Sequence, residues 1–309
     1  MINRLSSLAS SGTPFLVISD FKAETILVYT REELTQEDIE FSFTPSSQLH
    51  PTPLITLPIS FKAYQEQFDT IIEHIQAGET YLLNYTCSTP ISTSLSLQQI
   101  YQKAHAKFKL RYKDEFVCFS PERFIKIEGT TISTYPMKGT IDAAIENAKE
   151  KILSDEKEMA EHIMVVDLLR NDLGIVAKNI QVEKFRYVEH LQTGNKELLQ
   201  VSSKITAQLP NNWRKNFGSI LTALLPAGSI TGTPKRSTVN IIEEVEAHKR
   251  GFFTGVFGYF DGQDFDSAVM IRFIENNNGT LIYKSGGGIT IDSDSEDEYQ
   301  EMLDKIYIP

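Results

Sequence analysis

Three short runs of strand-forming residues follow one another closely near the middle of the chain, and this pattern restricts the fold most. The runs are Phe116–Phe119, Arg123–Glu128 and Thr131–Tyr135, and they are interrupted by Pro121 and Gly129. Proline and glycine mark turns, so the pattern predicts successive strands and not one long element. Strands joined by such short turns are typical of antiparallel sheets.

Helical patterns alternate with further strands on both sides of this region. Helices are predicted at about residues 61–77, 96–108 and 144–171, from Pro234, and from Ser293, which has capping-box spacing with Glu296. In the first third of the chain, further strands are predicted within 15–28 and 80–89. Two more are predicted at 182–188 and 198–208, with a polar loop at 190–196 between them. The last three are predicted at 254–259, 266–273 and 280–285.

These elements indicate an α+β protein with antiparallel strands and helices outside. The proline-rich stretch 42–58 is predicted to be an extended surface segment. No clean boundary interrupts the chain, so we expect residues 1–309 to form one unit, in which a short part at 1–60 merges into a core at 61–309.

Composition narrows the classes of partner. Of 309 residues, 41% are apolar, and the net charge is −11, which argues against nucleic acid as a partner. No apolar run is long enough for a membrane span, and the N-terminus lacks the apolar core of a secretion signal. Cys87 and Cys118 have neither disulfide nor metal-ligand spacing. We therefore expect a cytoplasmic protein with reduced thiols and no membrane partner.

Two carboxylates in the predicted C-terminal helix have a spacing that places them on one face. Glu298 and Glu301 are three residues apart, and Lys305 follows one turn later. Such a pair is typical of a solvated acidic surface. It also suits Mg²⁺, which prefers oxygen ligands and leaves positions for water and an anionic substrate. Glu161 would then be a third ligand, and spacing alone leaves both interpretations open.

Glycine-rich segments and one lysine suggest further chemistry. GSITGTPK (228–235) lacks the spacing of a nucleotide-binding loop, and the six histidines lack metal-ligand spacing. Backbone N–H groups in this segment and in Gly286–Gly288 are suited to binding an anion, although the glycines are equally typical of tight turns. Lys138, in YPMKGT, is either a solvated surface group or, if partly buried, a nucleophile.

Taken in order, eight segments resemble the chorismate-binding enzymes, a family that includes anthranilate, aminodeoxychorismate, isochorismate and salicylate synthases. They are SPERF (120–124), YPMKGT (135–140), EHIMVVDLLRNDLG (161–174), VSSKITAQLP (201–210), LPAGSITGTPKRS (225–237), GVFGYF (255–260), IR (271–272) and SGGGITIDSDSEDEYQEMLDK (285–305). Eight segments in register are highly specific. The resemblance implies two antiparallel β-sheets packed as a sandwich with helices outside.

The resemblance also implies a reaction. Lys138 would attack the ring of chorismate at C2 and expel the C4 hydroxyl, with Glu122 as general acid/base; ammonia would then add at C4 and displace the enzyme. Anthranilate synthases usually have alanine at the lysine position. The lysine therefore implies that the product is 4-amino-4-deoxychorismate, a precursor of p-aminobenzoate and folate.

The remaining positions match metal and substrate contacts of the family. By resemblance, the magnesium ligands are Glu161, Glu298 and Glu301, and the enolpyruvyl carboxylate is held by Tyr259 and Arg272. The resemblance also implies that the ring carboxylate is held by Ser229, Gly287 and Gly288. Lys305 matches a conserved cation, and Thr140 matches a substrate contact.

One departure and one absence complete the sequence picture. Gln200 stands where the family usually has a histidine tied to pyruvate elimination in the anthranilate branch, which implies either a reaction that stops at aminodeoxychorismate or altered activity. The sequence contains no glutaminase motif, so the resemblance implies that a separate glutamine amidotransferase subunit supplies ammonia. The alternatives are anthranilate synthase component I and, less favoured, a non-catalytic chorismate-binding protein.

Overall fold

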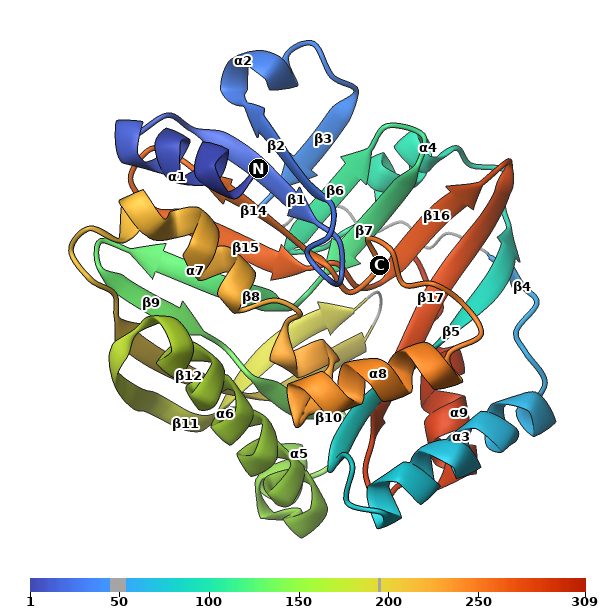
Figure 1. The fold of residues 1–309 in the computed structure, drawn as a ribbon. Helices are drawn as coiled ribbons and strands as arrows, with labels where there is room; N and C mark the ends of the chain where they lie inside the picture. Colours follow the sequence, from blue (N-terminus) through green and yellow to red (C-terminus); the bar gives the residue numbers. More distant parts are fainter. Residues whose placement is uncertain (45–53, 194–195) are drawn as a thin grey trace.

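The computed structural model describes residues 1–44, 54–193 and 196–309. Its strands form a larger and a smaller sheet (Figure 1). The larger sheet contains β1 (Phe15–Ser19), β2 (Ile26–Thr30), β8 (Arg123–Glu128), β9 (Thr131–Thr134), β10 (Met137–Asp142), β11 (Lys178–Thr193), β12 (Lys196–Gln208), β14 (Val256–Phe260) and β15 (Phe265–Val269). The smaller contains β3 (Ile39–Ser42), β4 (Ile55–Thr56), β5 (Leu82–Ser92), β6 (Phe108–Tyr112), β7 (Phe116–Ser120), β13 (Gly232–Thr233), β16 (Phe273–Asn277) and β17 (Thr280–Ile289).

The helices lie around these sheets (Figure 1). They are α1 (Ile2–Ser11), α2 (Arg31–Leu34), α3 (Phe61–Gln76), α4 (Leu97–Lys103), α5 (Ala148–Ser154), α6 (Glu156–Val176), α7 (Phe217–Ala223), α8 (Lys235–Val245) and α9 (Ser295–Asp304), with 3₁₀ turns at Trp213–Asn216 and Gly228–Ile230. In the part of the chain that the structure describes, none of the helices combines the length and apolar character needed to cross a membrane.

Every strand pair in the described residues is antiparallel, as predicted. The larger sheet has the order β10-β12-β9-β8-β15-β14-β1-β2, with β11 also paired to β12. The smaller has the order β13-β5-β17-β16-β7-β6-β3, with β4 paired to β5. Strands from the first thirty residues therefore share a sheet with strands near residue 260.

The two sheets pack face to face, and β1 shows why. All five of its residues are buried, because it is covered on both sides. Phe15 and Val17 point into a core shared with the helices, whereas Leu16 and Ile18 point into a second core with Phe108 and other side chains of the smaller sheet. This alternation confirms the predicted sandwich with helices outside.

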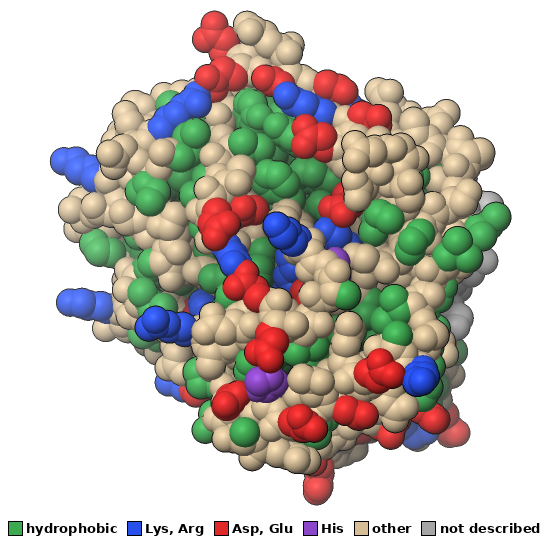
Figure 2. Space-filling view, turned by 45° about the vertical axis from the view of Figure 1, so that its right-hand side comes forward, with side chains coloured by type: hydrophobic (Ala, Val, Ile, Leu, Met, Phe, Trp, Pro, Cys, Tyr) green, Lys and Arg blue, Asp and Glu red, His purple; other side chains and the backbone are tan. Residues whose placement is uncertain are grey.

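Apolar and charged side chains occupy different parts of one face of the molecule. Figure 2 shows apolar side chains gathered in the upper half of one face, bordered above by acidic and basic side chains. Charged side chains of both signs gather around the middle of that face.

Several predicted boundaries are wrong. The helix predicted at 144–171 is two helices, because Asp155 is extended and its side chain accepts a hydrogen bond from the backbone N–H of Glu158, which starts α6. The helix predicted at 96–108 ends at Lys103, where the chain turns into β6. The strand predicted at 266–273 is interrupted after Val269, and the chain continues in β16.

Other differences concern turns and chain ends. The polar loop predicted at 190–196 is mostly strand, since β11 extends to Thr193 and β12 begins at Lys196. Asp294 and not Ser293 caps α9, whose first residue is Ser295. Helices α1 and α7, which we did not predict, cover one face of the larger sheet beside Phe15. Residues 45–53 of the predicted extended segment lie outside the described residues.

Candidate active site

One cavity of about 680 Å³ collects nearly all of the predicted site residues. It is lined by residues from both sheets, α6, α9 and the 228–230 turn. The predicted residues that line it are Glu122, Lys138, Thr140, Glu161, Ser229, Arg272, Gly287, Gly288, Glu298, Glu301 and Lys305. Gln200, which pairs with Thr140 across β12 and β10, lines it as well.

Lys138 is not the solvated surface group that local sequence suggested. It lies in β10 where the register with β12 shifts, and its side chain is 27% exposed. Its Nζ lies 3.2 Å from Oε2 of Glu161 on α6. A side chain at Gly288 would begin 3.2 Å from this Nζ, so the glycine leaves the amine room inside the cavity. The geometry therefore favours the second interpretation of Lys138, a partly buried amine in a binding site.

The carboxylates of α9 also line the cavity, where Glu298 is buried and the side chain of Glu301 is 54% exposed. Burial raises the pKa of Glu298, although a hydrogen bond of 2.7 Å from Ser293 acts in the opposite direction. Burial opposes ionisation of Glu301 too, but its ion pair of 2.5 Å with Lys305 outweighs burial and lowers its pKa. Glu158, one turn before Glu161, lines the same cavity and has a pKa raised by burial and by that neighbour.

These acidic side chains have the chemistry of a magnesium site without a closed ligand cage. Glu161, Glu298 and Glu301 line one cavity and supply only oxygen donors. Within the described residues, no three His, Cys, Asp or Glu side chains are grouped closely enough to hold a metal ion. Mg²⁺ commonly uses one or two protein carboxylates and completes its shell with water and substrate. The donor set therefore fits Mg²⁺, and the ion remains a prediction.

Glu122, which directly precedes β8, and Ser229 form a hydrogen-bonded pair that also lines the cavity. The Ser229 hydroxyl donates a hydrogen bond to Oε1 of Glu122. Burial raises the pKa of Glu122, while Ser229, Lys138 and Lys305 partly offset this effect. A carboxyl group whose pKa is raised by burial keeps its proton to higher pH than an ordinary glutamate, which suits it to general acid catalysis.

The turn that carries Ser229 is held by three polar groups. Asn84 donates its side-chain amide to the carbonyl of Ser229 at 3.0 Å, and Arg250 donates to the carbonyl of Ile230 at 2.9 Å. Asp172 accepts from the backbone of Gly228. The turn is separated from α8 by β13, and Ser229 and Ile230 of the turn line the cavity.

The three consecutive glycines lie in a strand and do not form the tight turn that was one of the two predicted possibilities. Gly286, Gly287 and Gly288 lie in β17 and pair with Thr86, Tyr85 and Asn84 of β5. A Cβ at Gly286 would lie 2.0 Å from the carbonyl oxygen of Tyr85. Glycine is required here because the neighbouring backbone occupies the space of a side chain.

Tyr259 does not line the cavity. It lies in β14 opposite Leu16, and its ring packs 5.3 Å from that of Phe41 in the second core. Phe257 faces the same core, as expected for residues two apart in a strand. Phe253, just before the GVFGYF segment, does line the cavity, as do Tyr283 and Tyr307. The structure therefore does not bring Tyr259 together with the other predicted site residues.

Arg272 lies in the cavity with an unusual environment. Its backbone has φ 49°, which is uncommon for a residue with a side chain. Among the described residues it has no carboxylate partner, and its guanidinium lies over the ring of Tyr307 at 4.7 Å. A guanidinium without a protein counter-ion is suited to binding an anionic ligand.

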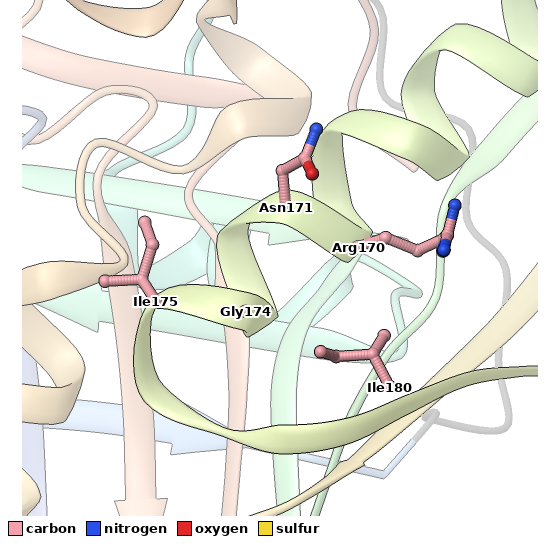
Figure 3. Close-up of a pocket in the computed structure, with 5 residues that line it drawn as sticks. All are labelled: Arg170, Asn171, Gly174, Ile175 and Ile180. Carbon is pink, nitrogen blue, oxygen red and sulfur yellow. The ribbon is translucent and has the colours of Figure 1, made fainter.

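A second hollow, of about 420 Å³, lies at the C-terminal end of α6 (Figure 3). Its lining residues are Arg170, Asn171, Gly174, Ile175 and Ile180. In Figure 3 the side chains of Arg170 and Asn171 point in different directions. The single charged group, Arg170, already pairs with Asp167. This hollow lacks the acid, amine and carboxylate groups of the larger cavity, which is therefore the candidate active site.

Comparisons with known proteins identify the family to which the chain is similar. The model of the chorismate binding enzyme family matches residues 17–309. A PabA-like protein of Haemophilus influenzae is 45% identical over 100% of this chain and 96% of its own length. Aminodeoxychorismate synthase component 1 of Escherichia coli is 31% identical over 98% of this chain and 69% of its own length.

Solved structures show the same fold. Anthranilate synthase component I of Streptococcus pneumoniae superposes with a TM-score of 0.69 at 26% identity, covering 84% of this chain and 60% of its own. The menaquinone-specific isochorismate synthase of Escherichia coli has a TM-score of 0.67 at 16% identity, covering 97% and 89%. Because the family model matches nearly the whole length of the chain, the chain belongs to the chorismate-binding enzyme family.

Proposed function

We propose that the chain is component I of aminodeoxychorismate synthase, which converts chorismate and ammonia to 4-amino-4-deoxychorismate. The observation that carries the proposal is the position of Lys138. Its Nζ lies inside the cavity against Glu161, and Glu122 lines the same cavity with a raised pKa. The similarity to aminodeoxychorismate synthase component 1 of Escherichia coli supports the same reaction.

The proposed reaction has two substitutions. The neutral amine of Lys138 forms a bond to C2 of chorismate, the ring electrons shift, and the C4–O bond breaks as Glu122 gives its proton to the departing hydroxyl, which leaves as water. Ammonia then forms a bond to C4, the bond between C2 and Lys138 breaks, and the lysine amine is released. A proton from the added ammonia restores Glu122, so the net change is exchange of hydroxyl for amine.

In this proposal Glu161, Glu298 and Glu301 hold Mg²⁺. The bound ion would screen the acidic side chains and attract the ring carboxylate of the substrate. Arg272 is placed to bind the second carboxylate, on the enolpyruvyl group, through its guanidinium. Ammonia is supplied by a separate glutamine amidotransferase subunit, consistent with the PabA-like name of the Haemophilus influenzae relative.

The decisive experiment is product analysis. Purified chain is incubated with chorismate, Mg²⁺ and an ammonium salt, with and without a lyase that converts aminodeoxychorismate to p-aminobenzoate. We expect p-aminobenzoate only when the lyase is present. Fluorescent anthranilate formed without the lyase would identify anthranilate synthase instead, and binding of chorismate without turnover would identify a non-catalytic binding protein.

Substitution of Lys138 tests the nucleophile. Lys138→Ala removes the amine, and Lys138→Arg keeps a positive charge beside Glu161 without a nucleophilic amine at neutral pH. We expect both to lower kcat for aminodeoxychorismate formation by on the order of 10³-fold or more while chorismate still binds. The control is Lys149→Ala, an exposed lysine on α5 outside the cavity. Normal product formation by either Lys138 variant would exclude the covalent step.

A further inference from the structure

The chain that follows α9 forms one end of the active-site cavity. Lys305 donates through Nζ to the carbonyl of Gly286 at 2.8 Å, and the Tyr283 hydroxyl donates to the carbonyl of Tyr307 at 2.9 Å. Ile308 is buried in a third apolar cluster against the smaller sheet, and the Pro309 carbonyl accepts from the backbone N–H of His105. The segment is thus fixed on both sides of Tyr307.

Tyr307 is the residue of this segment that faces Arg272. Both residues line the cavity, and the ring of Tyr307 lies 4.7 Å from the guanidinium. In the described part of the chain, Arg272 forms no ion pair with a carboxylate, and its guanidinium lies over the Tyr307 ring. The side-chain orientation of Arg272 is therefore set by an aromatic ring, an interaction that leaves its N–H groups free to donate to a ligand.

We infer that Tyr307 is a positioning residue for substrate binding, which acts by holding Arg272 in the orientation that receives a carboxylate. A free arginine side chain samples many rotamers, and a ligand that must select one of them binds more weakly. The ring restricts the side chain before the substrate arrives. The inference deepens the proposed function, since it takes chorismate as the ligand whose carboxylate Arg272 binds.

Direct binding of chorismate tests the inference without requiring amination. Dissociation constants are measured by calorimetry with Mg²⁺ and without ammonia, and every variant also carries Lys138→Ala, so that neither the covalent step nor amination occurs. Tyr307→Leu, which removes the ring, should weaken binding about fivefold. Tyr307→Gln should weaken it similarly with less disturbance of packing, and Tyr307→Phe should restore it. The matched control is Tyr81→Leu, an exposed tyrosine that does not line the cavity.

A double-mutant cycle separates positioning from a general structural effect. If Tyr307 acts through Arg272, Tyr307→Leu should cause no further loss of affinity in an Arg272→Ala protein. Unchanged affinity in both Tyr307→Leu and Tyr307→Gln, or an equal loss with and without Arg272, would overturn the inference. A wild-type chain that binds chorismate but forms no aminodeoxychorismate would refute the proposed function and leave the binding test intact.

Discussion

Burial and neighbouring charges shift the pKa values of individual residues in the cavity, and these shifts connect the fold to the chemistry. The pKa of Glu122 and of Glu298 is raised by burial, whereas that of Glu301 is lowered by Lys305 despite burial. Glu122 and Glu301 are both glutamates, but their pKa values are shifted in opposite directions. Glu122 is suited to giving a proton, and Glu301 to remaining a carboxylate.

The raised pKa of Glu122 predicts a specific pH dependence. The acid is active when protonated, so activity should persist above the ordinary range of a glutamate and fall as pH rises through the pKa of Glu122. Because the hydrogen bond from Ser229 lowers that pKa, Ser229→Ala should move the alkaline limb of kcat to higher pH. Glu122→Gln should lower kcat by about 10²- to 10⁴-fold.

These profiles are best measured at a constant concentration of free ammonia. Ammonium also loses its proton as pH rises, so the concentration of free ammonia would otherwise change along the profile. An alkaline limb that Ser229→Ala leaves in place would argue against Glu122 as its origin. A Glu122→Gln enzyme with normal kcat would exclude it as the acid.

At the scale of elements, β17 shows how a strand can serve a site through residues without side chains. Gly286 permits close pairing with β5, Gly287 lies beside the α9 carboxylates, and Gly288 leaves space for Lys138. The sequence indicated only that three glycines were important in this place. Periodicity could not show that they continue the strand predicted to end at Ser285, because glycine is uncommon in strands.

Two neighbouring substitutions separate these roles. Gly286→Ala places a methyl group against the Tyr85 carbonyl and should destabilise the protein by at least about 3 kcal/mol. Gly287→Ala meets only the flexible ends of Glu298, Glu301 and Lys305, the nearest at 3.2 Å, so stability should change by less than about 1 kcal/mol. Urea unfolding midpoints measure the difference. Equal midpoints for both variants would contradict the steric explanation of the Gly286 position.

The whole molecule decides which distant residues share the cavity. Glu161 lies on α6 and Glu298 and Glu301 lie on α9, far apart in the sequence. The long α6 packs beside β10, and α9 packs beside β17, so both helices present carboxylates to Lys138 from opposite sheets. The spacing of Glu298 and Glu301 was visible in the sequence, but their common cavity with Glu161 was not.

This arrangement predicts the magnesium dependence of the enzyme. If Glu298 holds Mg²⁺ as proposed, Glu298→Gln should raise the Mg²⁺ concentration for half-maximal activity by about tenfold or more, because the proposed ligand loses its charge. Glu296→Gln, an exposed residue on the same helix, serves as the matched control. Titration of activity with Mg²⁺ after removal of metal by a chelator measures both. Identical titration curves for the two variants would remove Glu298 from the ligand set.

The sequence by itself determined the α+β class, the antiparallel strands and most of the residues in the cavity, since these follow from local periodicity and from ordered motifs. Tertiary structure alone decided that Lys138 is partly buried against Glu161, that Phe253 lines the cavity and Tyr259 does not, and that Tyr307 covers Arg272. The physical reason is that burial and side-chain contact depend on which segments pack together. Local sequence specifies the direction of a side chain along its own element, but the packing of distant elements specifies what that side chain meets.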